Sequence, residues 1–169
     1  MSSLITQITR SGQLESFHVG YGVIVDAEGQ TVKSYGDAQY STYARSSAKP
    51  LQAMAVLRSG AYAKYALTPD ELAVTCSSHS GEPIHIQTVT RVFSKAGISP
   101  DLLACGIHPP IHTESAKQLQ AAGIEPQQIH NNCSGKHAGM LISATKLGYD
   151  PINYLDSEHP VQKYIYGIV

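Results

Sequence analysis

An alternating apolar pattern near the N-terminus is the feature that most narrows the folds possible for this chain. From Phe17 to Val25 every second residue is apolar, which is the period of a β-strand, and Gly20 and Gly22 on the other face predict that this face lies close to another segment. Turn-forming residues follow at 26–29, and β-favouring side chains resume over residues 30–35. We therefore predict an antiparallel hairpin in this region.

The rest of the sequence carries helix signals. Thr68, Pro69 and Glu71 form the pattern of an N-cap, a proline at the first helical position and a capping box. Ser80 is expected to cap the helix that follows it. Further predicted helices cover residues 50–60, 83–96, 113–123 and 135–147, with another start at Ser99. A hairpin followed by helices, without strand-helix alternation, favours the α+β class, with an antiparallel sheet flanked by helices, over a doubly wound parallel sheet.

Length and composition predict one globular domain over residues 1–169. The chain is 42% hydrophobic and 15% charged, which suits a sizeable core. A formal net charge of -1 without any basic run gives no support for nucleic acid or a membrane surface as partner. Residues 1–16 lack the continuous apolar run of a signal peptide or spanning helix, so we expect a cytoplasmic protein. Three widely spaced cysteines are expected to stay free of disulfides.

Ser46 and Lys49 carry the clearest chemical signal. On a helix, a lysine three residues after a serine lies on the same face, close enough to take the proton of an otherwise poorly nucleophilic hydroxyl. The same spacing serves the serine β-lactamases and penicillin-binding proteins. The spacing alone is weak, because Ser143 and Lys146 repeat it inside a predicted helix, where two solvated surface residues are the simpler interpretation. A capping serine and a surface lysine also stay open for the first pair.

Residues 131–140 form a second dense group of polar, reactive and small side chains, just ahead of an apolar helix. This segment is not a phosphate-binding loop, because His130 replaces the first glycine and His137 replaces the Ser or Thr after the lysine. Cys133, close to a helix start and to Lys136, suits a reactive thiol or a metal ligand. A small buried cysteine is the alternative.

Three motifs together resemble the L-asparaginase II family of the Rhizobium type. They are RSSAKP at residues 45–50, CSSHSGE at 76–82 and NNCSGKH at 131–137, in the order and spacing of the family. The resemblance covers the chain from about Glu15 onward. It implies a fold like that of serine β-lactamases, penicillin-binding proteins and glutaminases, and the hydrolysis of L-asparagine to L-aspartate and ammonia.

The resemblance also implies roles for single residues. Ser46 would be the nucleophile, Lys49 the general base, and Ser78 a member of a second Ser-Lys pair that relays protons. The expected substrate contacts are Arg45, His79 and Asn132. Cys133 and Lys136 would bind a zinc ion together with a further cysteine, and the family implies a homo-oligomer.

Members of that family are expected to continue beyond the position of Val169, where they keep the second catalytic lysine and the last zinc-binding cysteine. Neither Cys76 nor Cys105 stands at the position of that cysteine, so we expect a truncated chain with an incomplete zinc site. Three functions stay open. They are an asparaginase, a non-catalytic half-domain that needs a complementing C-terminal chain, and a glutaminase or β-lactam-type hydrolase on the same scaffold.

Overall fold

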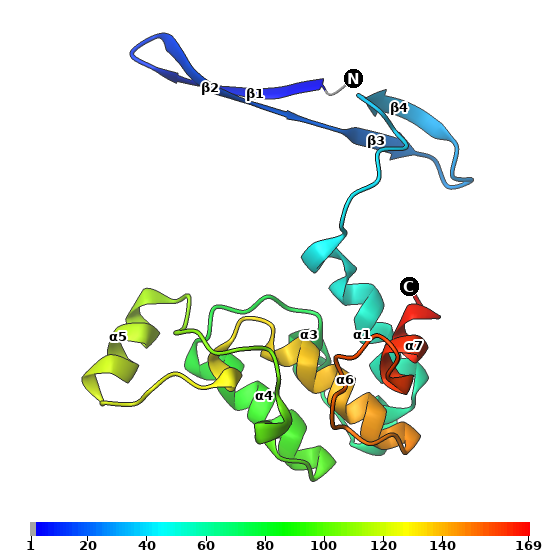
Figure 1. Cartoon of the computed structure of the whole chain (residues 1–169), viewed down its shortest axis with the longest axis vertical. Helices are drawn as coiled ribbons and strands as arrows, with labels where there is room; N and C mark the ends of the chain where they lie inside the picture. The colour runs from blue at the N-terminus through cyan, green and yellow to red at the C-terminus, as the bar shows by residue number, and fades with distance from the viewer. Residues whose placement is uncertain (1–2) are drawn as a thin grey trace. The chain divides into compact units, whose positions relative to one another are not determined.

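The computed structural model describes residues 3–169, and its elements confirm the predicted α+β class. Two antiparallel strand pairs come first, and helices follow without strand-helix alternation (Figure 1). The chain divides into two compact units, one that ends at Tyr43 and one from Ala44 to Val169. All of the candidate site residues belong to the second unit.

The N-terminal unit holds two separate β-hairpins. Strand β1 (Ser3–Arg10) pairs antiparallel with β2 (Gln13–Gly20), and β3 (Gly22–Val25) pairs antiparallel with β4 (Thr31–Tyr35). The predicted hairpin is thus confirmed for β3 and β4. The Asp26 carboxylate stabilises its turn by accepting hydrogen bonds from the backbone N–H groups of Glu28 and Gln30.

The prediction of one strand over residues 17–25 is wrong in its extent. The strand is interrupted at Tyr21, between Gly20 and Gly22, and the residues on either side pair with different strands. Glycine weakens a strand because it has no side chain to pack. The apolar alternation therefore continues past Tyr21, although the residues before it pair with β1 and the residues after it pair with β4.

The second unit of the described chain consists of seven α-helices and three short 3₁₀ turns. The helices are α1 (Lys49–Arg58), α2 (Ala61–Lys64), α3 (Pro69–Thr75), α4 (Pro83–Ala96), α5 (Thr113–Ala121), α6 (Ser134–Leu147) and α7 (Pro160–Tyr166). The 3₁₀ turns are η1 (Arg45–Ala48), η2 (Pro100–Leu102) and η3 (Gln128–His130).

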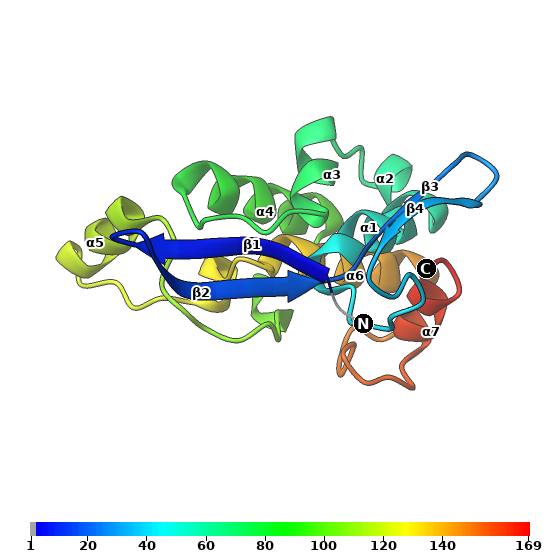
Figure 2. The same cartoon turned by 90° about the horizontal axis from the view of Figure 1, so that it is seen from above.

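Helix α6 is the centre of this unit, and α1, α3, α4 and α7 pack against it (Figures 1 and 2). Its residues 138–144 are all buried, which is the pattern of a helix surrounded on every side. Helix α3 approaches α6 closely at a glycine, since a Cβ atom on Gly135 would lie only 2.1 Å from the Val74 carbonyl oxygen. The core around α6 includes Leu141, Phe93 and Tyr154, each at most 1% exposed.

Helices α3 and α4 begin and end largely as predicted. The capping box of α3 is present, and the Thr68 N–H donates to the Glu71 side chain at 2.9 Å. Helix α4 ends at Gly97, which has a φ of 68°. The predicted N-cap of α4 is wrong, because Glu82 holds that position. Ser80 Oγ instead donates a hydrogen bond to the Glu82 carboxylate at 2.7 Å.

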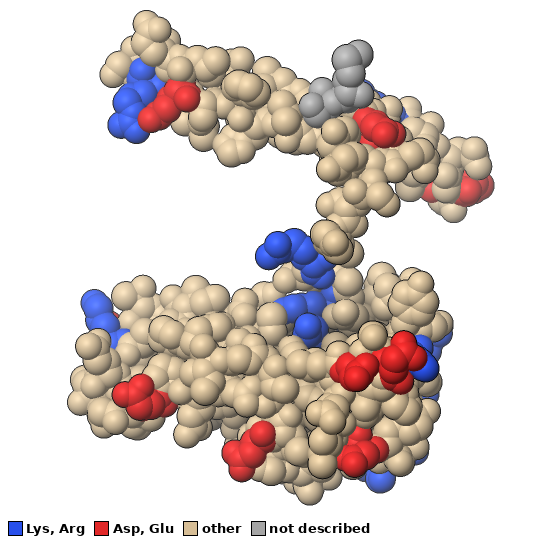
Figure 3. Space-filling model, in the orientation of Figure 1, with Lys and Arg blue, Asp and Glu red and all other residues tan. Residues whose placement is uncertain are grey.

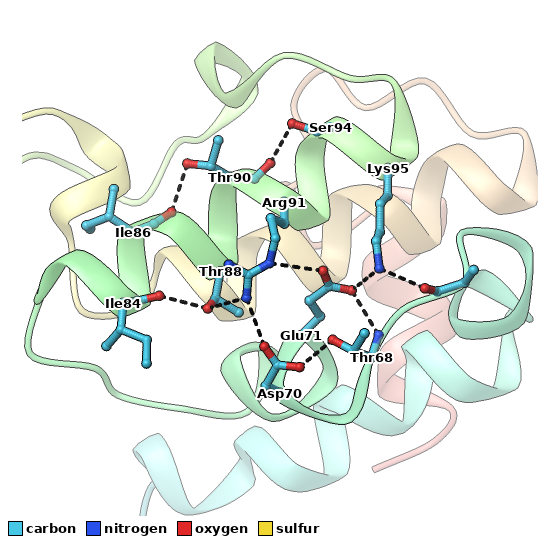
Figure 4. Close-up of polar contacts among 11 residues, drawn as sticks. Thr68, Asp70, Glu71, Ile84, Ile86, Thr88, Thr90, Arg91, Ser94 and Lys95 are labelled. Atoms are coloured by element: carbon cyan, nitrogen blue, oxygen red, sulfur yellow. Dashed lines mark hydrogen bonds and ion pairs between the residues drawn. The ribbon is translucent and has the colours of Figure 1, made fainter.

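A buried carboxylate joins α3 to α4. Glu71 is 1% exposed, and its carboxylate accepts hydrogen bonds from Lys95 Nζ at 2.6 Å and Arg91 Nε at 3.4 Å (Figure 4). Burial by itself raises the pKa of Glu71, but the hydrogen bonds from Lys95 and from the Thr68 N–H outweigh it and hold the pKa below its usual value. Glu71 therefore stays ionised at neutral pH and ties the start of α3 to α4.

Charged side chains are few on the surface. On the face drawn in Figure 3, basic and acidic residues stand among many uncharged ones, in keeping with a formal net charge of -1 over the sequence. Among the described residues, none of the helices has both the length and the apolar character needed to cross a membrane.

Candidate active site

The segment from Ser46 to Lys49 lies where a 3₁₀ turn passes into a helix. Ser46 belongs to η1, and Lys49 is the first residue of α1, directly before Pro50. The pair therefore lies at the start of the helix that the sequence predicts over residues 50–60. Arg45 has a φ of 48°, in the left-handed region that residues with side chains seldom adopt. Strain of this kind persists only where the surrounding structure holds it, and it is frequent at functional sites.

The Lys49 side chain is buried and fully paired. It is 3% exposed, and its Nζ donates to the Ser78 Oγ at 2.6 Å, to the Ser77 carbonyl oxygen at 2.7 Å and to the Cys133 Sγ at 3.3 Å. The interpretation of Lys49 as a surface lysine is therefore wrong. A buried amine surrounded by a hydroxyl, a carbonyl and a sulfur atom can exchange a proton with its neighbours.

Ser46 joins this group through Ser78. The two hydroxyl oxygens are 3.2 Å apart, and both residues are exposed, so a substrate can reach them. Among the described residues no hydrogen bond links Ser46 directly to Lys49. The contacts thus run from Ser46 to Ser78 and from there to Lys49. The capping interpretation of Ser46 is also wrong, because Ala48 is the N-cap of α1.

His79 fastens the loop that carries Ser78. Its backbone N–H donates to the Asn132 carbonyl oxygen at 3.1 Å, its Nε2 lies 2.8 Å from Ser134 Oγ, and its Nδ1 accepts from the Gly81 N–H at 3.2 Å. Burial, followed by electrostatic repulsion from nearby His85, Lys49 and His108, lowers the pKa of His79 to about 4. At neutral pH the ring is therefore uncharged.

Asn131 and His108 brace the start of α6, and neither was predicted as a site residue. The Asn131 amide donates to the carbonyl oxygens of Cys105 and Gly106 at 2.8 and 3.1 Å, while its Oδ1 accepts from the Cys133 N–H at 2.8 Å. This last bond is an Asx turn, which an asparagine just before a helix start could have indicated. His108 Nε2 accepts from the Asn132 backbone N–H at 3.3 Å, a contact with no signal in the sequence.

Comparison with known proteins assigns the chain to a family. The family model for L-asparaginase II matches residues 6–169. The chain belongs to the L-asparaginase II family. The match includes the three sequence motifs and every residue of the Ser46, Ser78 and Lys49 group, and it identifies the protein as an asparaginase-type amidohydrolase at the level of the family. A search of curated proteins found no match to the chain.

The described part of this asparaginase-family chain does not by itself form a complete zinc site. Cys133 and Lys136 are partly buried at the start of α6, but residues 3–169 contain no group of three His, Cys, Asp or Glu side chains that could hold a metal ion. The nearby Cys105 Sγ instead donates to the Gln128 carbonyl oxygen at 3.3 Å. The two donors stay predicted ligands, short of the four that structural zinc requires.

Ser143 and Lys146, the second serine and lysine pair with this spacing, lie in α6. Ser143 is fully buried in α6, where its Oγ donates to the Gly139 carbonyl oxygen at 2.8 Å. The prediction that Ser143 is a solvated surface residue is therefore wrong. Since its hydroxyl is engaged with the backbone of its own helix, the spacing to Lys146 creates no second site.

Proposed function

We propose that this member of the L-asparaginase II family hydrolyses the side-chain amide of L-asparagine to L-aspartate and ammonia, through an acyl-enzyme on Ser46. The observation that carries the proposal is the chain of contacts from the exposed Ser46 Oγ through Ser78 Oγ to the buried Lys49 Nζ, at 3.2 and 2.6 Å. A nucleophilic hydroxyl needs a base within hydrogen-bond reach, and this chain supplies one through a single intermediate group.

The contacts support a proton relay in place of direct transfer between Ser46 and Lys49. The relay requires Lys49 to have released one of the three protons that its Nζ donates at rest, so that the nitrogen lone pair faces Ser78 Oγ. As the Ser46 hydroxyl then attacks the amide carbon, its proton passes to Ser78 Oγ, and the Ser78 proton passes to Lys49 Nζ. Collapse of the tetrahedral intermediate breaks the C–N bond, and the leaving nitrogen takes a proton back along the same path and departs as ammonia. Backbone N–H groups at the start of α1 are proposed to stabilise the oxyanion.

Deacylation reverses these roles. A water molecule attacks the ester carbon and gives its proton to the relay, and the Ser46 oxygen leaves and recovers a proton from Ser78. Water and L-asparagine thus yield L-aspartate and ammonia, and the protein is regenerated. Splitting the reaction in this way replaces one high barrier with two lower ones.

The substrate contacts are proposed to come from residues beside the relay. Arg45 directly precedes the nucleophile, and a guanidinium pairs well with a carboxylate such as that of the amino-acid substrate. Asn132 lies at the turn before Cys133, next to the loop of Ser78. His79 was also predicted as a substrate contact, but both of its ring nitrogens are engaged within the protein.

Ammonia release from L-asparagine tests the proposal, with Ser46→Ala and Ser47→Ala as a matched pair. Ser47 is the neighbouring exposed serine, and its hydroxyl donates to the Ala44 carbonyl oxygen outside the relay. We expect Ser46→Ala to lose at least about 10³-fold in kcat, because removing any one member of a catalytic unit abolishes most of the rate enhancement of the whole unit. Ser47→Ala should stay within about twofold of the parent. Equal rates for the parent and Ser46→Ala would show that Ser46 is not the nucleophile.

Two further measurements separate the alternatives. Intact mass after incubation with a reactive ester analogue should show an adduct that is absent in Ser46→Ala, whereas no adduct and no ammonia would favour a half-domain that needs a complementing chain. Rates on L-glutamine and a chromogenic β-lactam should fall below the rate on L-asparagine. A higher kcat/KM for either one would move the substrate assignment to that compound and leave the mechanism in place.

A further inference from the structure

We propose that His79 is a positioning residue, which keeps Ser78 between Ser46 and Lys49 by fastening the loop of residues 77–81 to the start of α6. The inference rests on the proposed function, because it requires Ser78 to carry a proton. It differs from a substrate contact, because His79 would act through Ser78 and not on the substrate.

The hydrogen bonds around the ring define one protonation state. Ser134 Oγ donates its proton to the Ile129 carbonyl oxygen at 2.9 Å, so the bond between His79 Nε2 and Ser134 Oγ at 2.8 Å must be donated by Nε2. Nδ1 accepts from the Gly81 N–H at 3.2 Å and so carries no proton. The ring is therefore the neutral tautomer with its hydrogen on Nε2, and every one of its polar atoms is used.

The two ring nitrogens of His79 attach the loop to two different places. Nε2 reaches the first residue of α6, Nδ1 closes the loop onto Gly81, and the His79 backbone N–H reaches the Asn132 carbonyl oxygen at 3.1 Å. Ser78 is the preceding residue, so its backbone is fixed relative to α6.

Space around the loop is tight. A Cβ atom on Gly81 would lie 2.9 Å from Pro110 Cβ and 3.2 Å from the His130 carbonyl oxygen. The loop therefore has little room to move as long as the His79 ring stays in place. The Lys49 Nζ contacts to Ser77 and Ser78, at 2.7 and 2.6 Å, depend on that position.

A substrate-binding role makes a different demand on His79. The ring is 4% exposed, and a substrate atom could bond to it only after Ser134 or Gly81 had given up its bond. Loss of a positioning residue lowers kcat, because the relay atoms separate while the substrate still binds. Loss of a substrate contact that acts equally on ground state and transition state raises KM. The two roles are therefore distinguishable.

Single variants remove one bond at a time. His79→Gln places an amide nitrogen near the position of Nε2 and keeps the bond to Ser134, and His79→Asn places an oxygen near Nδ1 and keeps the bond to Gly81. Ser134→Ala removes the partner of Nε2 without changing the histidine. Ser143→Ala is the matched control, because Ser143 is also 0% exposed in α6 but its hydroxyl bonds within the helix, at Gly139.

We expect Ser134→Ala and His79→Asn each to lower kcat about 10- to 100-fold on L-asparagine, with KM within about twofold of the parent. Ser143→Ala should keep the parent kcat. The kcat of the double variant His79→Asn with Ser134→Ala should lie within about twofold of the kcat of the slower single variant. Both changes delete the same bond, between His79 Nε2 and Ser134 Oγ. Thermal unfolding of all variants shows whether each one is folded at the assay temperature.

Several outcomes would overturn the positioning role. They are a Ser134→Ala enzyme as fast as Ser143→Ala, a raised KM with unchanged kcat in the His79 variants, and additive losses in the double variant. If the parent releases ammonia in a Ser46-dependent way while Ser134→Ala is unaffected, only the positioning role fails. If Ser46→Ala equals the parent, the proposed function fails and the positioning role fails with it.

Discussion

A lysine side chain that is 3% exposed needs a partner for each of its three N–H groups, and Lys49 has all three. The partners come from residues 28, 29 and 84 positions further along the chain. The spacing of Ser46 and Lys49 predicted that the lysine would lie near enough to take the serine proton directly. It did not predict that Ser78 would stand between them, because only the packing of α1, α3 and α6 brings these segments together.

Lys49→Arg separates the charge of this side chain from its role as a base. Arginine keeps the positive charge but does not lose its proton in proteins. We therefore expect kcat to fall at least about 10³-fold, while the folded state is retained. Ammonia assays and thermal unfolding measure the two effects. Lys64→Arg, at an exposed lysine in α2, is the control and should match the parent. Substantial activity in Lys49→Arg would rule out the uncharged amine as the proton acceptor.

Helix boundaries were predictable where the capping residues are the usual ones. Thr68 and Glu71 marked the start of α3, and Gly97 marked the end of α4. Helix α7 was not predicted, although Pro160 stands in its first turn; its N-cap is His159, whose Nδ1 accepts from the Val161 N–H at 3.1 Å. Histidine is not among the residues that signal an N-cap.

At the scale of elements, Glu71→Gln tests how α3 is held to α4. Glutamine keeps the shape and removes the charge that Lys95 and Arg91 face at 2.6 and 3.4 Å. We expect a loss of about 1–3 kcal/mol in the free energy of unfolding, below the range for fully buried pairs because both cations are partly exposed. Urea unfolding followed by helical circular dichroism measures it. Glu158→Gln removes the exposed pair with Lys163 and should have almost no effect; an equal loss in the two variants would contradict the expectation.

The close approach of α3 and α6 leads to a second prediction at this scale. Gly135→Ala adds a Cβ atom 2.1 Å from the Val74 carbonyl oxygen, so α6 must move away from α3. The expected loss is about 1–3 kcal/mol or more, in spite of the higher helix propensity of alanine. Gly139→Ala should lose less, because its nearest contact is a Thr75 side-chain atom at 3.0 Å. Urea midpoints rank the two, and a more stable Gly135→Ala variant would show that the helices are free to separate.

For the whole molecule, the α+β class followed from the order of hairpin and helix signals. The division at Tyr43 did not, because no composition change marks it. The neutral state of the buried histidines was equally hidden in the sequence, since it depends on partners that the fold supplies. His137 is 6% exposed and its Nδ1 lies 2.6 Å from the Tyr154 hydroxyl. Burial, followed by the charges of Lys136 and Lys49, lowers its pKa to about 4.

The stability of the helical unit should consequently depend on pH. The pKa values of His79 and His137 are both about 4 in the folded chain, against roughly 6.5 when unfolded. Between these values the unfolded chain binds more protons, so the free energy of unfolding falls as the pH is lowered, by at most about 1.4 kcal/mol per pH unit for each histidine.

Urea unfolding at pH 7, 6 and 5, followed by helical circular dichroism, should show a steep decline of the free energy of unfolding in the parent and a shallower one in His79→Gln. His18→Gln, at an exposed position in β2, should keep the parent slope. Equal slopes in the parent and His79→Gln would mean that His79 takes up a proton as readily in the folded chain as in the unfolded one.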